Sequence, residues 1–181
     1  MIIRETKLSG CIVLEPRVFN DERGYFFESF NQNTFNDLIG ENITFIQDNE
    51  SFSSKGVLRG LHYQLGEHAQ AKLVRVIKGS VLDVAVDVRK DSSTFGQYVA
   101  VELTEENKKQ LFVPRGFAHG FIVLSDTAIF SYKCDNFYTK ASEGGIIYND
   151  KDLNIDWKLD EKEFIVSEKD FLLPNLKAAK L

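Results

Sequence analysis

The sequence predicts an all-β fold in which helices are accessory. Short segments rich in Val, Ile, Phe and Tyr recur along the chain, turn-forming residues separate several of them, and the helical signals between them are weak and short. Many short strands without long alternating helices are typical of a sandwich, jelly roll or barrel rather than a doubly wound sheet. The interior of such a barrel provides a pocket.

Eight segments have the composition of strands. They are Tyr25 to Phe30, Thr44 to Phe52, Val57 to Tyr63, Lys72 to Ile77, Val81 to Val88, Tyr98 to Leu103, Gly120 to Leu124 and Ala128 to Lys133. Two glycine-containing turns, Ser54-Lys55-Gly56 and Lys78-Gly79-Ser80, are short enough to close hairpins, which predicts antiparallel pairing of the strands on either side.

The segment from Val81 to Val88 alternates in polarity. Its even-numbered positions are all apolar, whereas the odd-numbered set contains Asp83 and Asp87, so we expect one core face and one polar face. The helical signal is strongest from Thr34 to Ile39, ended by Gly40, with a second turn near Glu105 to Lys109.

Length and composition predict a single soluble domain over residues 1–181. The hydrophobic fraction of 43% and charged fraction of 27% are ordinary, no apolar run is long enough to span a membrane, and charges in the first residues argue against a signal peptide. The net charge of -5 argues against a general nucleic-acid surface. Cys11 and Cys134 are far apart and outside any CxxC pattern, which favours reduced thiols and a cytoplasmic location.

His62, within the run RGLHYQ from Arg59 to Gln64, is the first candidate for a catalytic base. Simple alternation places Arg59 and His62 on opposite faces, so both can enter one pocket only if the strand bulges or twists, which Gly60 permits. A histidine in a strand is more often structural than catalytic, so its role depends on its surroundings.

Polar residues on the neighbouring segments fit a ligand pocket as well as a solvated edge. Gln47 and Asn49 share a face of their strand and can orient a sugar hydroxyl or a phosphate. Lys72 opens an apolar strand, so its ammonium either extends to solvent or faces a polar cavity.

Two further side chains can complete proton-transfer chemistry. Tyr132 shares a strand face with Phe130 and Ala128, which predicts an inward ring whose hydroxyl needs a partner. Asp170, near the C-terminus, would fix the tautomer of His62 and raise its basicity if the fold brought the two together.

The segment from Pro114 to His119 resembles the second conserved motif of cupins, in which the histidine is often a metal ligand. The first cupin motif would supply a His-x-His pair and a Glu, whereas the corresponding place here contains His62-Tyr63-Gln64, and His68 is a poor substitute. We therefore expect no catalytic metal, although a metal-dependent cupin oxygenase remains an alternative.

Four ordered motifs resemble the deoxythymidine diphosphate (dTDP)-4-dehydrorhamnose 3,5-epimerase family, a cupin family of sugar-nucleotide enzymes. They are DERGYFFESF at Asp21 to Phe30, QDNESFSSKGVLRGLHYQ at Gln47 to Gln64, AKLVRVIKGSVLDVAVDVR at Ala71 to Arg89 and VPRGFAHGFIVLSD at Val113 to Asp126. The resemblance implies a cupin-type jelly roll that needs no cofactor and forms a homodimer partly by exchanging N-terminal strand structure.

The resemblance also implies roles for individual residues. It makes His62 the proton acceptor, Asp170 its supporting carboxylate, Tyr132 the proton donor and Lys72 the contact to the sugar's C4 oxygen. It assigns aromatic residues such as Tyr138 to the base, and the following residues to the substrate and its diphosphate: Arg23, Glu28, Gln47, Asn49, Arg59, His119, Glu143 and Lys169.

The implied reaction is epimerisation at C3 and C5 of dTDP-4-dehydro-6-deoxy-D-glucose to dTDP-4-dehydro-L-rhamnose, a step of L-rhamnose biosynthesis. A C4 ketone acidifies the hydrogens on both neighbouring carbons, so one stabilised enolate oxygen serves both inversions. Epimerisation at C3 only, 3,4-ketoisomerisation of a related nucleotide sugar, and non-catalytic sugar binding remain alternatives.

Overall fold

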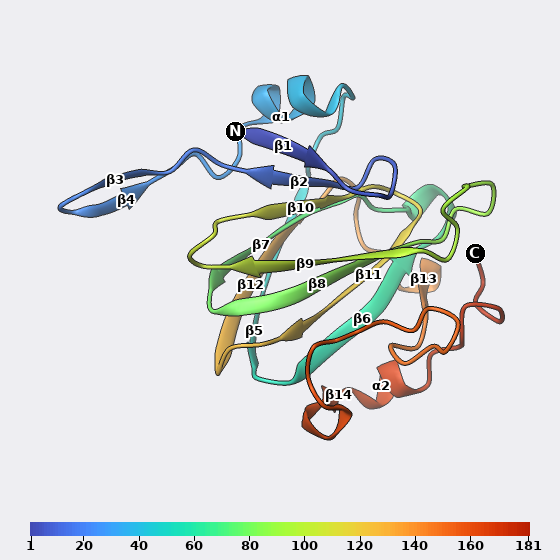
Figure 1. Cartoon of the computed structure of the whole chain (residues 1–181). Helices are drawn as coiled ribbons and strands as arrows, with labels where there is room; N and C mark the ends of the chain where they lie inside the picture. Colours follow the sequence, from blue (N-terminus) through green and yellow to red (C-terminus); the bar gives the residue numbers. More distant parts are fainter.

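The computed structural model describes residues 1–181, whose strands form two facing antiparallel sheets (Figure 1). The first sheet has the order β1 (Ile2–Glu5), β2 (Ile12–Glu15), β10 (Gln110–Val113), β7 (Lys72–Lys78), β12 (Thr127–Cys134) and β5 (Gln47–Ser54). The second has the order β13 (Glu143–Gly145), β6 (Val57–Gln64), β11 (Phe117–Val123), β8 (Ser80–Asp87) and β9 (Tyr98–Thr104). The short strand β14 (Ile165–Val166) runs parallel to β6 at the edge of the second sheet.

The helices are short, as expected. Helix α1 (Gln32–Ile39) is capped by the side chain of Asn31 and ends at Gly40, which has a φ of 75°. Helix α2 is a single turn (Glu168–Phe171), and three 3-10 turns cover Gly66–His68, Lys140–Ser142 and Glu161–Glu163. The turn expected near Glu105 to Lys109 is present over residues 105–107, although it does not extend into a helix. No helix has the length and apolarity needed to cross a membrane.

A hairpin of β3 (Phe19–Asp21) and β4 (Gly24–Phe26) projects from the body of the molecule (Figure 1). The strand expected from Tyr25 to Phe30 therefore ends early, because the chain leaves the hairpin after Phe26 and turns towards α1. The strand expected to start at Thr44 begins at Gln47. The short strands β1, β2, β10 and β13 were missed by the sequence patterns because each has only three or four residues.

Both predicted hairpins are wrong, because the two turns cross from one sheet to the other. Strand β5 pairs with β12 in the first sheet, whereas β6 pairs with β11 in the second, and β7 and β8 are divided in the same way. The corners are tight: a Cβ on Gly56 or Gly79 would lie 2.0 or 2.1 Å from a backbone carbonyl oxygen. Both positions also have a positive φ, so glycine is needed for its backbone conformation as well as for its lack of a Cβ.

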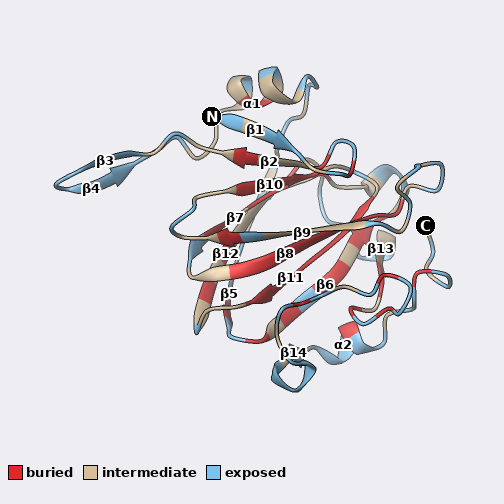
Figure 2. Ribbon diagram, viewed as in Figure 1, coloured by how far each residue is buried: buried red, intermediate tan, exposed pale blue.

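Two hydrophobic cores lie on the two sides of the second sheet (Figure 2). Strand β8 shows this directly, because Val81 and Ala85 pack between the sheets whereas Val84 packs beneath the C-terminal segment. The expected polar face of this strand is therefore also buried, and Asp83 and Asp87 lie inside the protein with hydrogen-bonding partners. A third cluster lies under α1.

Candidate active site

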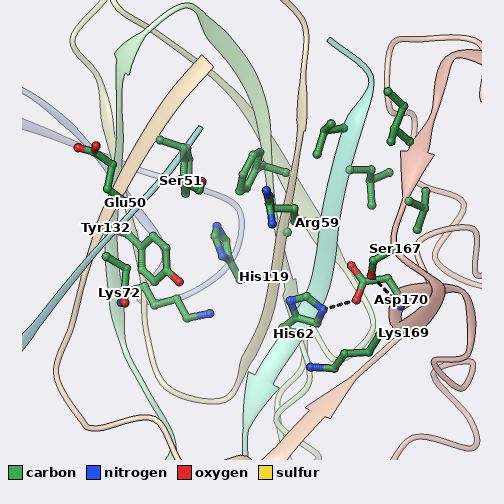
Figure 3. A pocket seen from close by; sticks show the side chains of 18 residues that line it. Glu50, Ser51, Arg59, His62, Lys72, His119, Tyr132, Ser167, Lys169 and Asp170 are labelled. Atoms are coloured by element: carbon green, nitrogen blue, oxygen red, sulfur yellow. Dashed lines mark hydrogen bonds and ion pairs between the residues drawn. The ribbon is translucent and has the colours of Figure 1, made fainter. Parts of the chain in front are cut away.

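A cavity of about 660 Å³ opens between the two sheets (Figure 3). Strands β5, β6, β7, β11 and β12 line it, and the C-terminal segment containing β14 and α2 closes one side. A second cavity of about 290 Å³ adjoins it and shares four lining residues, which are Asn49, His62, Lys72 and Tyr132. Because they share these residues, the two cavities form one continuous cleft.

His62 and Asp170 form a hydrogen-bonded pair in this cleft. The distance from His62 Nε2 to Asp170 Oδ1 is 2.8 Å, and the Gly60 amide donates to Asp170 Oδ2 at 3.2 Å. Burial raises the pKa of Asp170, but the His62 hydrogen bond and charge, with the Gly60 and Ser167 contacts, outweigh it and hold the pKa below its ordinary value. The ionised carboxylate keeps the proton of a neutral His62 on Nε2, which leaves Nδ1 as the accepting nitrogen.

The strand irregularity predicted at Gly60 is present. The pairing of β6 with β11 shifts register between His119 and Phe121, opposite Gly60, and both Arg59 and His62 line the cleft. Gly60 has a φ of 131°, and a Cβ there would lie 2.5 Å from the Cα of Gly120. The close backbone contact therefore requires glycine at this point of the strand.

Tyr132 and Lys72 complete the centre of the cleft. Figure 3 shows the Tyr132 ring and the His62 imidazole on opposite sides, with the Lys72 side chain reaching between them. Burial raises the pKa of Tyr132, so the phenol keeps its proton. Lys72 Nζ lies 5.8 Å from the Tyr132 ring centroid and forms no salt bridge, whereas seven other lysines do. Burial lowers the pKa of Lys72, opposed by Cys134, Asp83 and Glu143.

Two further side chains of the cleft, Arg59 and His119, are held by protein partners. The Arg59 guanidinium donates to Ser53 Oγ from both Nε and Nη2 at 3.2 Å, which leaves its other N–H groups to face the cavity. His119 Nε2 lies 3.0 Å from both carboxylate oxygens of the buried Asp83. This histidine is therefore oriented by a carboxylate, and the chain contains no group of three metal-binding side chains.

The adjoining cavity is lined by a connected polar network. Gln47 donates to Asn49 Oδ1 at 3.1 Å, and the Tyr138 hydroxyl donates to Glu143 Oε2 at 2.8 Å. Lys169 forms an ion pair with the other oxygen of Glu143. Burial raises the pKa of Glu143, but the bonds from Lys169 and Tyr138 outweigh it and lower the pKa.

Arg23 and Glu28 are the two predicted site residues that lie outside the cleft. Arg23 is at the tip of the projecting hairpin, where it pairs with Asp21. Glu28 follows the hairpin and accepts a hydrogen bond from Asn31. The other eleven predicted residues line one cavity or both.

Several polar residues of the site were missed from the sequence, and four of them position or accompany a predicted one. Asp83 binds His119, Ser53 binds Arg59, Ser167 caps the turn that carries Asp170, and Ser51 lines the cavity. Ser51 and Ser53 lie at odd positions of β5, as Gln47 and Asn49 do. The two-residue period of a strand therefore predicts that all four lie on the inner face.

The family model of dTDP-4-dehydrorhamnose 3,5-epimerase matches residues 5–178 of the chain. The enzyme of that name from Salmonella typhimurium is 54% identical over 181 residues, covering 100% of this chain and 98% of the relative. The chain belongs to the dTDP-4-dehydrorhamnose 3,5-epimerase family. The fold predicted from the resemblance, a cupin-type jelly roll with short helices, is confirmed by the structures of this family.

Solved structures of the family superimpose closely on this chain. That of the 3,5-epimerase from Elizabethkingia anophelis has a TM-score of 0.94 at 59% identity, covering 98% of this chain and 97% of that one. The Legionella pneumophila relative, in complex with dTDP-4-keto-L-rhamnose, has a TM-score of 0.94 at 48% identity, with coverages of 98% and 93%. A 3'-monoepimerase from Streptomyces bikiniensis, in complex with dTDP-quinovose, has 0.90 at 33%, with coverages of 95% and 86%.

Proposed function

We propose that this protein inverts C3 and C5 of dTDP-4-dehydro-6-deoxy-D-glucose to give dTDP-4-dehydro-L-rhamnose, without a cofactor. The observation that carries the proposal is the arrangement of His62, bonded to Asp170, across the cleft from Tyr132 with the unpaired Lys72 between them. The names of the relatives at 54% identity support the same reaction.

The first step is removal of the proton on the carbon next to the ketone. His62 Nδ1 accepts this proton, and the electrons of the C–H bond move to the C4 oxygen to form an enolate. Asp170 stabilises the imidazolium that results. Lys72 is free of any carboxylate partner, so its charge is available to the enolate oxygen.

The second step is protonation of the carbon from the opposite side. Protonation by His62 would regenerate the substrate, so inversion requires an acid across the ring, and Tyr132 is a neutral phenol in that place. The phenolate then recovers a proton, and His62 releases the one it took, so that the product is an isomer of the substrate. The same groups act at C5 because both carbons adjoin the C4 ketone.

Binding of the remaining parts of the substrate follows from the charges along the cleft. Arg59 has a planar fork of N–H donors that fits diphosphate oxygens, and Lys169 lies at the edge of the same cavity. Tyr138, which is half exposed beside the second cavity, is placed to stack on the base. These contacts hold the sugar ring between His62 and Tyr132.

In a homodimer, the hairpin that carries Arg23 would bring this residue to the cleft of the second chain. The hairpin carries Phe19, Tyr25 and Phe26 at 51%, 56% and 71% exposure, and an apolar segment that projects from its own chain is typical of one covered by a partner. We infer that a second copy covers it and that Arg23 contributes to the partner's site. We also propose that residues 1–181 act as one domain in the cytoplasm, which agrees with two free, buried cysteines.

The reaction is tested by proton NMR of dTDP-4-dehydro-6-deoxy-D-glucose incubated with the protein in deuterated water. We expect deuterium at both C3 and C5 and a product with the L-rhamno configuration. With His62→Asn we expect no exchange while the nucleotide sugar still binds. Deuterium at C3 alone would indicate a monoepimerase, a 3-keto product would indicate a ketoisomerase, and binding without exchange would contradict any epimerase function.

The shared site is tested by mixing two inactive variants, Arg23→Ala and His62→Asn, after dissociation and reassembly. In the mixed dimer one cleft combines the intact His62 of one chain with the intact Arg23 of the other, so about a quarter of wild-type activity returns. If Arg23 acts within its own chain, mixing restores no activity.

A further inference from the structure

The cleft contains a second histidine that is held by a carboxylate. His119 Nε2 lies 3.0 Å from both carboxylate oxygens of Asp83, and these oxygens have no other hydrogen-bonding partner in the chain. Asp83 is on β8, diagonally across from His119 on the neighbouring strand β11. The side chains of His119 and Asp83 are 7% and 0% exposed, whereas that of His62 is 31% exposed. The second pair is therefore fixed more deeply than the first.

The other ring nitrogen of His119 is open to the cavity. Nδ1 forms no hydrogen bond within the chain, and every buried side-chain nitrogen of the protein has a partner, so Nδ1 is not buried. His119 lines the larger cavity, and Figure 3 shows its ring between the side chains of Tyr132 and His62. This nitrogen is therefore placed to meet an atom of the ligand.

Asp83 determines which nitrogen of His119 carries the proton. A carboxylate accepts hydrogen bonds, so the neutral imidazole keeps its proton on Nε2, and Nδ1 is left with a lone pair directed into the cavity. Nδ1 then accepts a hydrogen bond from a donor of the ligand. It cannot donate one to a phosphate or ketone oxygen.

The register of the strands places this donor on the sugar ring. His119 and His62 are register partners on β11 and β6, and the Cβ atoms of such a pair are about 5 Å apart. His62 faces the reacting carbons in the proposed function, so the ligand atom that meets His119 lies on the same ring. The hydrogen-bond donors of that ring are its hydroxyl groups at C2 and C3.

The carboxylate and amide acceptors of the larger cavity are committed elsewhere. Asp170 accepts from His62 and from the Gly60 amide, and Asn49 Oδ1 accepts from Gln47. Glu50 is an even-numbered residue of β5, so its side chain points to the outer face of the sheet. His119 Nδ1 is therefore the acceptor that remains for a sugar hydroxyl.

We propose that His119 Nδ1 accepts a hydrogen bond from a ring hydroxyl of the sugar, at C2 or C3, and that Asp83 positions it to do so. The assignment rests on the proposed function, in which His62 remains the base. Asp83 does not touch the substrate. It acts through His119, because the bonds to both of its oxygens fix the tautomer and the plane of the ring.

The first test combines a change in the protein with a change in the substrate. The paired variant Asp83→Leu with His119→Phe removes both partners, so no buried group is left without one. It is compared with the wild type on dTDP-4-dehydro-6-deoxy-D-glucose and on the 2-deoxy and 3-deoxy analogues, with NMR detection of deuterium exchange at C5, which all three substrates retain. His68→Phe, outside the cleft, is the matched control and should match the wild type on every substrate.

We expect the paired variant to lower kcat/KM for the full substrate about ten- to hundredfold. The loss should appear mainly in KM, because the hydroxyl is not the group that transfers the proton. One of the two analogues should show a similar loss with the wild type and no further loss with the variant, which identifies the hydroxyl. Losses that multiply for both analogues would overturn the assignment.

The second test reads the proton on His119 directly by ¹⁵N NMR, which is practical because the chain has three histidines. In the wild type with bound substrate we expect a neutral His119 with its proton on Nε2. Asp83→Asn, which keeps the shape of the side chain, should move part of the proton to Nδ1 and raise KM, because the amide can donate to Nε2.

Three results would count against these expectations. A doubly protonated His119 in the complex would make Nδ1 a donor and overturn the assignment. An Asp83→Asn protein with the wild-type tautomer and KM would overturn the positioning role. A wild-type protein that neither binds dTDP nor exchanges deuterium would instead overturn the proposed function itself.

Discussion

Replacing Lys72 with Met should lower activity and raise stability at the same time. The ammonium lies in the cleft without a salt bridge, and burial lowers its pKa, so the folded protein holds a charge that its surroundings disfavour. Met has a similar length and no charge. Removal of one group that stabilises an enolate typically lowers kcat about 10²- to 10³-fold, which is the loss expected in the NMR exchange assay.

The expected gain in stability follows from the direction of the pKa shift. A lysine whose pKa is lower in the folded state binds its proton less tightly there, so the charged form disfavours folding at neutral pH, and this penalty disappears as pH rises towards the unfolded value of about 10.4. We expect Lys72→Met to stabilise the protein by about 1 to 2 kcal/mol at pH 7. Each kcal/mol raises the Tm by about 2 to 4 °C in a chain of this size, and the gain should shrink at alkaline pH.

The measurement is urea unfolding and exchange kinetics on the same preparations. Lys78→Met is the matched control, because Lys78 is exposed at the far end of the same strand. The free energy of unfolding of this variant should differ from that of the wild type by less than about 0.5 kcal/mol. A Lys72→Met protein that lost stability but kept its exchange rate would refute the reasoning, because Lys72 would then support the fold rather than the enolate.

Three further changes test other parts of the structure. Tyr132→Phe should slow formation of inverted product about 10²-fold while deuterium exchange by NMR persists; equal loss of both would make Tyr132 structural. Asp170→Asn should slow exchange about 10²- to 10⁴-fold with dTDP affinity unchanged, because the amide cannot hold the His62 proton on Nε2; a wild-type rate would contradict the pair. Asp87 accepts bonds from Arg89, Ser92 and Thr94, which outweigh its burial and hold its pKa below the ordinary value. Its contribution to stability is therefore present above about pH 3.9 and lost below it, so Asp87→Asn should destabilise by about 2 to 4 kcal/mol at pH 7 in urea unfolding, with a gap to the wild type that narrows below pH 4.

Local sequence patterns predicted the strands well but not their partners. The glycine turns at Gly56 and Gly79 mark where the chain reverses, yet they do not determine which sheet receives the next strand, because that depends on closure of the barrel by distant segments. The prediction of a solvated face on β8 was wrong because it also depends on distant segments of the chain. A face with Asp83 and Asp87 is solvated in an open sheet, but here both sides of the sheet are covered.

The site could be predicted from the sequence only where its geometry is local. The conflict between Arg59 and His62 in a regular strand predicted the irregularity at Gly60, because both residues and the glycine lie within one strand. The contact between His62 and Asp170 spans 108 positions, and it was expected through the family resemblance rather than from spacing. The position of Arg23 depends on a second chain in our proposal, which no pattern within one chain specifies.

The polar groups of the cleft fall into two sets that differ in whether the protein itself satisfies them. Arg59 and His119 already have partners that fix their orientation, whereas Lys72 and Ser51 have none. Groups of the first kind are positioned before the ligand arrives, which reduces the entropy lost on binding. Lys72 has no salt-bridge partner in the protein, so its ammonium is available to an oxygen of the ligand. In the proposed reaction that oxygen is the C4 oxygen of the sugar, and the ring is held with its reacting carbons between His62 and Tyr132.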